Sequence, residues 1–453
     1  MTPPPQTADH VHQLIRRAQD LLRARDPAGA RRAADAALAL DGGDIVARNA
    51  LGSVLYELGD LDGARGLFQG VLAENPHYGD ALNNLGNILA REGKPRPALE
   101  FYERALAASP DNADYLANLG GVRQALGDVA GALACFEQAL TADPAHADAR
   151  WNRGLARLLS GDLAGGFADY ETRWRLPEFI ARQLGAAQWS GEDVRERTIL
   201  VHSEQGYGDT IQMVRFAKVL AARGASVLVE TQATLAPLLR DVGGVSRVIV
   251  HGESLPRFDL HIPMMSLPAA CGVAALADIP AEHGYIAAPA GPAVQLPPRD
   301  GDEFRVGLVW AGRATHQNDR NRSLDATHLA PLAALAKVKL FSLQIGAHAG
   351  DLAHLPGIVD LAPRLTDFGV TARILDQLDL VISVDTAVAH LAGAMGREAW
   401  VMLPFAPDWR WLLGRNRSPW YPSLRLYRQP KIGDWTSVVA VVAANLAARA
   451  RAG

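Results

Sequence analysis

The sequence predicts an all-α superhelix of short repeats followed by two α/β lobes, each built on a parallel sheet. Glycine recurs every 34 residues through the first 170, which is typical of stacked helix pairs. From about residue 197, short β-branched runs alternate with longer helical stretches, a pattern that indicates parallel strands covered by helices. The length of 453 residues agrees with this organisation, because it predicts about three domains.

The repeat unit is defined by residue sets that keep the 34-residue step. A small residue where two helices meet, glycine ending the first helix, alanine and an aromatic residue on the second, and proline opening the next turn describe a helix pair. We predict five units, beginning near residues 11, 45, 79, 113 and 147, the first with Ala18 in place of its glycine. The sets are Gly52, Gly86, Gly120 and Gly154; Gly59, Gly93, Gly127 and Gly161; Ala64, Ala98 and Ala132, with Gly166 in the fifth unit; Phe68, Tyr102, Phe136 and Tyr170; and Pro76, Pro110 and Pro144.

The period and the string ALNNLGNILAREGKPRPALEFYERALAASP at residues 81–110 resemble the tetratricopeptide repeat, especially the repeats of protein O-GlcNAc transferases. The resemblance covers roughly residues 11–180. One helix pair cannot bury its apolar face alone, so neighbouring units stack into a curved solenoid whose inner wall is a groove. Grooves of this kind bind polypeptide segments, which predicts a protein partner.

A recurring asparagine is the candidate feature for binding a protein partner in the groove. Asn84, Asn118 and Asn152 stand two places before the glycine on the first helix of their units, the helix that lines the concave wall in such solenoids. A carboxamide donates and accepts hydrogen bonds, so a row of them can hold the peptide groups of an extended chain. The row resembles the asparagine ladder of protein O-GlcNAc transferases. The alternative is that these side chains solvate a helix face or bond a neighbouring loop.

The α/β part is predicted as two lobes in tandem. The first has TILVHS (198–203), a helix from Asp209 to Gly224, SVLVETQ, a helix through Leu239, RVIVHG and FDLHIP. A linker rich in Pro, Ala and Gly follows at 287–303. The second lobe has RVGLVWAG (305–312), KLFSLQI, LVISVD (380–385), AWVMLP (399–404) and a final helix from Thr436 to Arg449.

Two such lobes indicate the GT-B arrangement, with a ligand cleft between the facing carboxyl ends of the strands. Separate sheets fused in another way are the alternative. We therefore predict three domains: repeats at 1–180, a first lobe at 181–296 and a second lobe at 297–453.

The candidate catalytic residue is Asp209, in the loop after the first strand. Gly206 and Gly208 let this loop turn tightly and place Asp209 at a helix start that faces the cleft. A carboxylate there can accept the proton of an attacking hydroxyl. Ile211 stands where the dinucleotide fingerprint needs a third glycine, and GxxxxGK[ST] does not occur, which disfavours dehydrogenase and P-loop functions. Helix capping is the alternative role of Asp209.

A second group, Asp385, Thr386 and His390, follows the strand LVISV directly, on a helix that ends near Gly396. Helix N-termini stabilise phosphate oxygens through free N–H groups and the helix dipole. We therefore predict a diphosphate here, the alternative being a capped helix with a core histidine.

Two motifs resemble the bacterial heptosyltransferase family. VISVDTAVAHLAGAMG is similar to its DTGxxHLAAA motif, with Ala387 in place of the family's glycine, and QGYGDTIQMVRF is similar to its first loop. The resemblance implies that Asp209 is the general base and that Asp385, Thr386 and His390 bind the sugar nucleotide.

Between these motifs, the segment from His316 to Ser323 stands where the family has a phosphate-contacting lysine, and alignment of the following HLAPLA suggests Arg322 for that role. Arginine can fork onto phosphate oxygens. The loop PDWRWLLGRNRSPWYP (407–422) resembles bacterial repeat-linked glycosyltransferases, including flagellin-modifying enzymes. The predicted donor-binding set is Gly206, Gly208, Arg320, Arg322, Asp385, Thr386 and His390.

The composition narrows the partners. Lys and Arg number 45 against 49 Asp and Glu, so no global basic field attracts nucleic acid or anionic membrane. Cys135 and Cys271 stand in no metal-ligand spacing and are expected to be reduced core residues. The N-terminus lacks a signal-peptide pattern and no run reaches the length of a membrane span, which predicts a cytoplasmic protein. We expect no metal and no cofactor, because a helix dipole and basic side chains can neutralise a leaving diphosphate.

The functional prediction is an inverting transfer of sugar from a nucleotide donor to Ser or Thr hydroxyls of a protein held by the repeats, with flagellin as one acceptor. Two alternatives stay open. One is an inactive scaffold that only binds partners, against which the retained Asp209 and the complete Asp385 motif argue. The other is a heptosyltransferase-like enzyme of lipopolysaccharide synthesis, in which the asparagine ladder would have no purpose.

Overall fold

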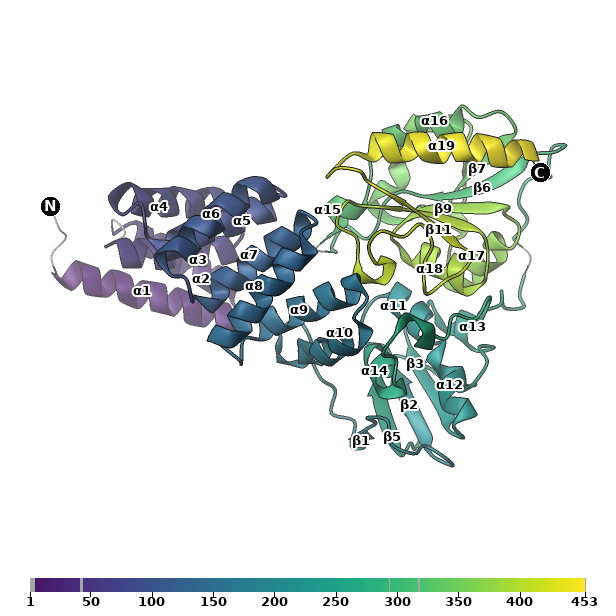
Figure 1. Cartoon of the computed structure of the whole chain (residues 1–453), viewed down its shortest axis with the longest axis horizontal. Helices are drawn as coiled ribbons and strands as arrows, with labels where there is room; N and C mark the ends of the chain where they lie inside the picture. Colours follow the sequence, from purple (N-terminus) through teal and green to yellow (C-terminus); the bar gives the residue numbers. More distant parts are fainter. Residues whose placement is uncertain (1–4, 41–43, 293, 317, 453) are drawn as a thin grey trace. The chain divides into compact units, whose positions relative to one another are not determined.

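The chain folds into a helical part and an α/β part (Figure 1). The computed structural model describes residues 5–40, 44–292, 294–316 and 318–452. The chain divides into two compact units, Met1–Arg153 and Gly154–Gly453. The first is all-helical and the second contains two parallel sheets with helices, so the predicted fold class is confirmed.

Ten helices form the five predicted pairs. Four of the pairs begin at the residues that the 34-residue period indicated, whereas the first helix begins at Pro5, before its predicted start near residue 11. The helices are α1 (Pro5–Arg23), α2 (Pro27–Leu38), α3 (Ile45–Glu57), α4 (Leu61–Glu74), α5 (Gly79–Arg91), α6 (Pro95–Ala108), α7 (Ala113–Ala125), α8 (Val129–Ala142), α9 (Ala147–Ser160) and α10 (Leu163–Tyr170).

The recurring small and aromatic residues do the packing that their types suggest. A Cβ atom on Gly86 would lie 2.6 Å from the ring of Tyr102, and one on Gly120 would lie 2.5 Å from the ring of Phe136. Real Cβ atoms do not approach carbon so closely, so the first helix of each of these pairs needs glycine where the aromatic residue of the second helix packs.

The first sheet lies in the second unit and has five parallel strands in the order β1-β5-β2-β3-β4. The single helix predicted from Asp209 to Gly224 is two helices, α11 (Tyr207–Met213) and α12 (Phe216–Ala222). The strands are β1 (Ala187–Gln188), β2 (Thr198–His202), β3 (Ser226–Thr231), β4 (Val245–Val250) and β5 (Leu260–Pro263); the other helices are α13 (Ala236–Leu239) and α14 (Leu267–Cys271).

The second sheet has six parallel strands in the order β11-β10-β9-β6-β7-β8. In chain order this is the 3-2-1-4-5-6 arrangement of Rossmann folds, with its switch point between β6 and β9. The strands are β6 (Phe304–Val309), β7 (Val338–Ser342), β8 (Val359–Asp360), β9 (Leu380–Val384), β10 (Ala399–Leu403) and β11 (Leu424–Arg428).

Figure 1 shows α16 and α19 on one face of this sheet and α17 and α18 on the other. Val438, Val442 and Leu446 of α19 are buried with β6 and β9 in one apolar cluster, which explains the confirmed final helix. The helices are α15 (Asp319–Arg322), α16 (Ala330–Ala333), α17 (Phe368–Leu375), α18 (Ala387–Ala394) and α19 (Trp435–Ala452).

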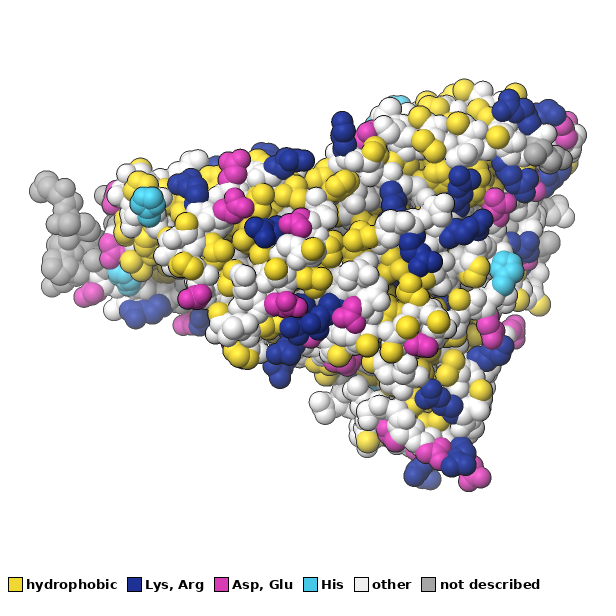
Figure 2. Space-filling view, viewed as in Figure 1, with side chains coloured by type: hydrophobic (Ala, Val, Ile, Leu, Met, Phe, Trp, Pro, Cys, Tyr) yellow, Lys and Arg dark blue, Asp and Glu magenta, His cyan; other side chains and the backbone are white. Residues whose placement is uncertain are grey.

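The surface agrees with recognition by local sites. Figure 2 shows Lys and Arg side chains interspersed with Asp and Glu on the face drawn, rather than gathered in one patch. Over the residues that the structure describes, no helix combines the length and the apolar character needed to cross a bilayer.

Candidate functional site

The two lobes of the second unit meet where α11 packs on α18. Both helices follow central strands, α11 after β2 and α18 after β9, so the contact lies at the carboxyl ends of both sheets, where ligands bind in folds of this type. Gly208 of α11 lies against His390 of α18: a Cβ atom there would lie 2.8 Å from Cδ2 of His390. Gly208 is therefore required by the packing of the two lobes, whatever its part in donor binding.

Asp209 makes one contact within its own helix start and one with the second lobe. Its Oδ2 accepts a hydrogen bond from the Gly206 N–H at 2.8 Å, which caps α11. Its Oδ1 forms an ion pair with Arg410 of the second lobe. Each carboxylate oxygen has two lone pairs, so both contacts leave room to accept a proton. The Asp209 side chain is 22% exposed, so a substrate hydroxyl can reach it.

Arg410 contacts residues of both lobes at this interface. Its Nε donates to Gln212 Oε1 at 2.7 Å, and its Nη1 donates to Asp408 Oδ1 at 2.9 Å. The guanidinium also lies over the ring of Trp409, 4.3 Å from the centroid. Burial lowers the pKa of Arg410, but Asp408 and Asp209 outweigh it and raise that pKa above its ordinary value. Arg410 is therefore a fixed cation that holds Asp209 in place.

His390 is buried between the lobes rather than exposed. Its Nδ1 lies 2.9 Å from the Tyr421 hydroxyl, and its Nε2 lies 3.9 Å from Oδ1 of Asp385. Its ring stacks on Trp411 with centroids 5.3 Å apart. Burial, together with nearby arginines that include Arg410, holds the pKa of His390 well below its ordinary value, so the imidazole is neutral.

Asp385 and Thr386 form the turn into α18. Within the residues that the structure describes, the Thr386 side chain makes no capping hydrogen bond, and its hydroxyl lies 2.9 Å from the Ser383 hydroxyl instead. Burial raises the pKa of Asp385 to about 6, and the Asp408 carboxylate adds to the rise. The start of α18 therefore offers its N–H groups beside a carboxyl group that takes up a proton more readily than an ordinary aspartate does.

Arg322 reaches across the switch point of the second sheet. Its Nη1 donates to the Asp385 carbonyl oxygen at 3.1 Å, and its Nε donates to Asp319 Oδ1 at 3.3 Å. The Arg322 side chain is 15% exposed, whereas Arg320 on the same short helix is exposed. Of the two predicted arginines, the structure brings Arg322 to the turn into α18.

The loop at 407–422 closes the interface from the second lobe. Besides Arg410, it supplies Tyr421 to His390 and the Trp420 carbonyl oxygen to Arg215 Nη1 of the first lobe, at 2.8 Å. Arg215 is buried and also donates to the Tyr285 hydroxyl at 2.9 Å. The density of aromatic and basic residues in this loop was the signal for these contacts, but their partners on the other lobe were not predictable from it.

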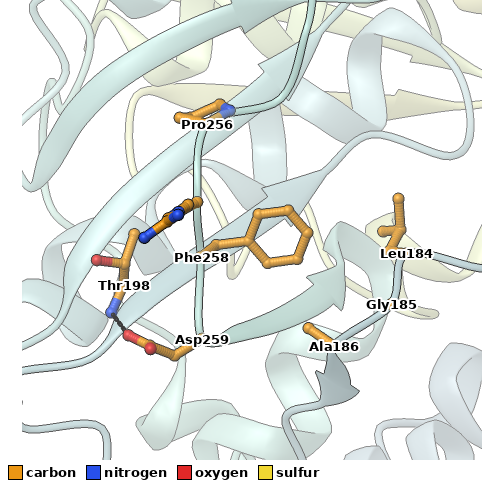
Figure 3. A pocket seen from close by; sticks show the side chains of 8 residues that line it. Leu184, Gly185, Ala186, Thr198, Pro256, Phe258 and Asp259 are labelled. Atoms are coloured by element: carbon orange, nitrogen blue, oxygen red, sulfur yellow. Dashed lines mark hydrogen bonds between the residues drawn. The ribbon is translucent and has the colours of Figure 1, made fainter.

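A cavity of about 380 Å³ lies away from this contact, at the amino ends of the strands of the first sheet (Figure 3). It is lined by the first residue of β2, Thr198, whose N–H donates to Asp259 at 2.7 Å, and by Leu184 and Phe258. Ligands of such sheets bind at the carboxyl ends of the strands, so this cavity is not the candidate site.

The asparagine row lies in the first unit and is partly engaged. Asn118 Nδ2 donates to Asn83 Oδ1 at 2.9 Å, and Asn84 Nδ2 donates to Ser53 Oγ at 3.3 Å, in each case in the preceding repeat. Asn84, Asn118 and Asn152 are all half-buried. The amide groups of Asn84 and Asn118 thus tie neighbouring repeats together, and their acceptor-binding role stays a prediction.

Comparison with known proteins agrees with this division. A model of the tetratricopeptide repeat matches residues 15–78, 49–113 and 118–177. A model of glycosyltransferase family 9 (heptosyltransferase) matches residues 337–399, which include Asp385, Thr386 and His390 but not Asp209. The combination is consistent with a tetratricopeptide-repeat-linked glycosyltransferase.

Protein FlbA of Caulobacter vibrioides is 28% identical over 314 residues, which cover 61% of this chain and 51% of that protein. The chain thus matches about half the length of this curated relative. Among solved structures, a thermophilic repeat protein of Thermus thermophilus is 21% identical over 37% of this chain and 91% of its own, with a TM-score of 0.34. PilW, a type IV pilus biogenesis factor, is 20% identical over 40% of this chain and 81% of its own, also with a TM-score of 0.34.

Proposed function

We propose that this chain transfers a sugar from a nucleotide-sugar donor to a Ser or Thr hydroxyl of a protein acceptor, with inversion, in a GT-B pair of lobes. The observation that carries the proposal is the contact of α11 with α18. Through this contact, the helix that carries Asp209 in one lobe lies against the helix of the other lobe whose N-terminus we propose as the phosphate site. The acceptor hydroxyl attacks the anomeric carbon, its proton passes to Asp209, and the bond from that carbon to the diphosphate oxygen breaks.

The diphosphate belongs at the start of α18. Uncapped N–H groups and the helix dipole favour an anion there, and the Arg322 guanidinium lies on the carbonyl of Asp385 beside them. These groups supply positive charge to the leaving diphosphate, so we propose that transfer needs no divalent ion. Addition of a chelator should therefore leave the transfer rate unchanged.

Transfer is tested by incubating the chain with UDP, ADP and CMP sugars and a candidate acceptor protein, and by measuring the intact mass of the acceptor. Flagellin is the first acceptor to try, because the loop at 407–422 resembles that of flagellin-modifying enzymes, and the reaction would take place in the cytoplasm. We expect a mass increase of one sugar per modified site. An acceptor that stays unmodified with every donor, while the chain still binds it, would favour the inactive scaffold.

The acceptor is held by the repeats, and the asparagine row is the part to test. Replacing Asn84, Asn118 and Asn152 together by alanine should weaken acceptor binding by roughly tenfold or more, because each removes hydrogen bonds of about 0.5–1.5 kcal/mol. Donor affinity should stay constant. Circular dichroism and the melting temperature are needed beside the titration, since Asn84 and Asn118 also bond neighbouring repeats. A folded triple variant that binds acceptor as the wild type does would assign capture to other residues.

Sugar transfer to a lipopolysaccharide precursor is the competing function, and the match to the heptosyltransferase family favours it. The two functions differ in what the repeats do. If the acceptor is a lipid-linked sugar, the triple asparagine variant should transfer at the wild-type rate, whereas a protein acceptor requires the intact groove.

A further inference from the structure

We propose that Tyr170, the aromatic residue of the last repeat, is a positioning residue of the transfer site, because its hydroxyl holds Gln205 at the base of the Gly206–Asp209 turn. The inference rests on the proposed function, since it assigns Tyr170 to the same site. It gives the fifth repeat a part in the reaction that the other repeats do not have.

The ring of Tyr170 is not among the three atoms nearest to the glycine of its own pair. In three earlier repeats, the aromatic residue packs on the glycine of its own pair, as Tyr102 does on Gly86. In the fifth repeat, the three atoms nearest to a Cβ on Gly154 belong to Asp169, to the Gly166 carbonyl and to the Tyr170 backbone nitrogen. The closest packing on Gly154 therefore comes from other atoms than the Tyr170 ring, unlike in the three earlier repeats.

Its hydroxyl is instead bonded to the catalytic loop. Gln205 Nε2 donates to the Tyr170 hydroxyl at 2.9 Å, and the hydroxyl lies 3.2 Å from Gln205 Oε1. Gln205 directly precedes Gly206, whose N–H is bonded to Asp209, so the chain of contacts ends on the proposed base. Tyr170 is 3% exposed, and burial raises its pKa, which keeps the hydroxyl protonated.

The helix that carries Tyr170 also touches the other side of the Asp209 ion pair. Phe167, one turn earlier on α10, packs edge-on against Trp409 with ring centroids 5.6 Å apart. Trp409 in turn lies under the Arg410 guanidinium. Since α10 supports both the loop before Asp209 and the loop that carries Arg410, a small shift of this helix changes the geometry of the pair.

The chain supplies a matched control for the test. Tyr102 has the same repeat position, is 2% exposed, and donates its hydroxyl to a carboxamide, Asn87 Oδ1, at 2.7 Å. Phenylalanine occupies this position in two other repeats, Phe68 and Phe136, so both tyrosines should accept phenylalanine without loss of fold. Tyr170→Phe and Tyr102→Phe therefore remove equivalent hydrogen bonds, one at the site and one away from it.

We expect Tyr170→Phe in the full chain to lower kcat about two- to tenfold, the equivalent of one neutral hydrogen bond, with little change in the KM for the donor. Hydrogen exchange of the backbone at 204–210 should become faster. Tyr102→Phe should leave both readouts at the wild-type level. Gln205→Leu should have the effect of Tyr170→Phe, and the double variant should be no worse than either single variant.

Equal kcat and equal exchange at 204–210 in the two phenylalanine variants would overturn the inference, as would additive effects in the double variant. If the wild-type chain transfers no sugar from any donor tried, the proposed function fails. The exchange measurement then still decides whether Tyr170 holds the loop, because it needs no turnover.

Discussion

The two helix starts that meet between the lobes, at α11 and at α18, are satisfied in opposite ways. At α11 the carboxylate of Asp209 bonds the Gly206 N–H, so the helix start has its own anion. At α18 the Thr386 hydroxyl is turned to Ser383, and in the described part of the chain its side chain caps nothing. The start of α11 thus has a carboxylate on one of its N–H groups, whereas Thr386 supplies no such partner at α18, where the N–H groups favour an added anion. We therefore expect the first to hold the base and the second to hold the diphosphate.

Asp209→Asn should give the largest effect and tests the α11 side of the comparison. The amide keeps the size of the side chain but cannot accept the proton, so the transfer rate should fall by on the order of 100-fold or more. Acceptor binding should be unaffected. A single-turnover assay beside an acceptor titration measures both, and a variant with wild-type turnover would leave Asp209 as a helix cap.

Arg322→Ala tests the α18 side. A hydrogen bond to a charged group contributes about 1.5–3 kcal/mol, so the donor dissociation constant should rise roughly 10- to 100-fold. Arg320→Ala is the matched control on the same short helix, and we expect a smaller rise because that side chain is exposed. Calorimetry with the nucleoside diphosphate alone is sufficient. If Arg322→Ala and Arg320→Ala bind the nucleoside diphosphate equally well, the diphosphate does not lie at Arg322.

Gly208→Ala tests the contact that joins the two helix starts. The added Cβ would lie 2.8 Å from the buried ring of His390, so α11 has to shift on α18. Such overpacking costs about 1–3 kcal/mol, and we expect transfer to fall by roughly tenfold and the melting temperature to drop. Gly66→Ala in α4 is the control, because a Cβ there meets no described atom within 4 Å. Unchanged turnover in Gly208→Ala would show that the lobe contact is not needed for transfer.

Asp385→Asn should change stability in the direction opposite to Gly208→Ala. Because the folded pKa of about 6 lies above the ordinary 3.8, ionisation of Asp385 destabilises the fold as the pH rises through this window. The difference of about two pKa units corresponds to on the order of 2–3 kcal/mol. The variant should therefore melt several degrees higher than the wild type at pH 7.5 and at the same temperature near pH 4.

Thermal melts at the two pH values check this prediction. A variant that melts lower than the wild type at pH 7.5 would mean that the ionised carboxylate stabilises the turn, and that the environment of Asp385 is not the one described.

Much of the fold could be predicted because it follows from local periodicity. The starts of α3, α5, α7 and α9 were read from the 34-residue spacing of glycine, alanine, aromatic and proline residues, since a helix pair of fixed length repeats its contacts at a fixed step. The helix predicted after the first strand was wrong as a single helix, and β1, β8 and β11 were missed. β1 and β8 have two residues each, too few to give a pattern.

The site was predicted in its separate parts but not in its connections. Asp209 and the Asp385 motif were found from strand-loop-helix patterns, because such patterns are local, whereas Arg322 came from the resemblance to the heptosyltransferase family. Arg410 was not singled out. It lies 201 residues from Asp209, the carboxylate with which it pairs. Sequence spacing carries no information about a contact of that length, which depends on how two separate sheets pack.

The sequence by itself determined the repeat step, the two series of parallel strands and the residues at the helix starts, because helix and strand geometry impose these on neighbouring residues. Only the tertiary structure decided what each of them touches. Tyr170 has the same repeat position as Tyr102, yet one hydroxyl is bonded to Gln205 in the loop before Asp209 and the other is bonded within its own repeat. The physical reason is that a side chain's periodicity fixes its direction from the backbone, whereas its partner is set by the element that packing brings opposite it.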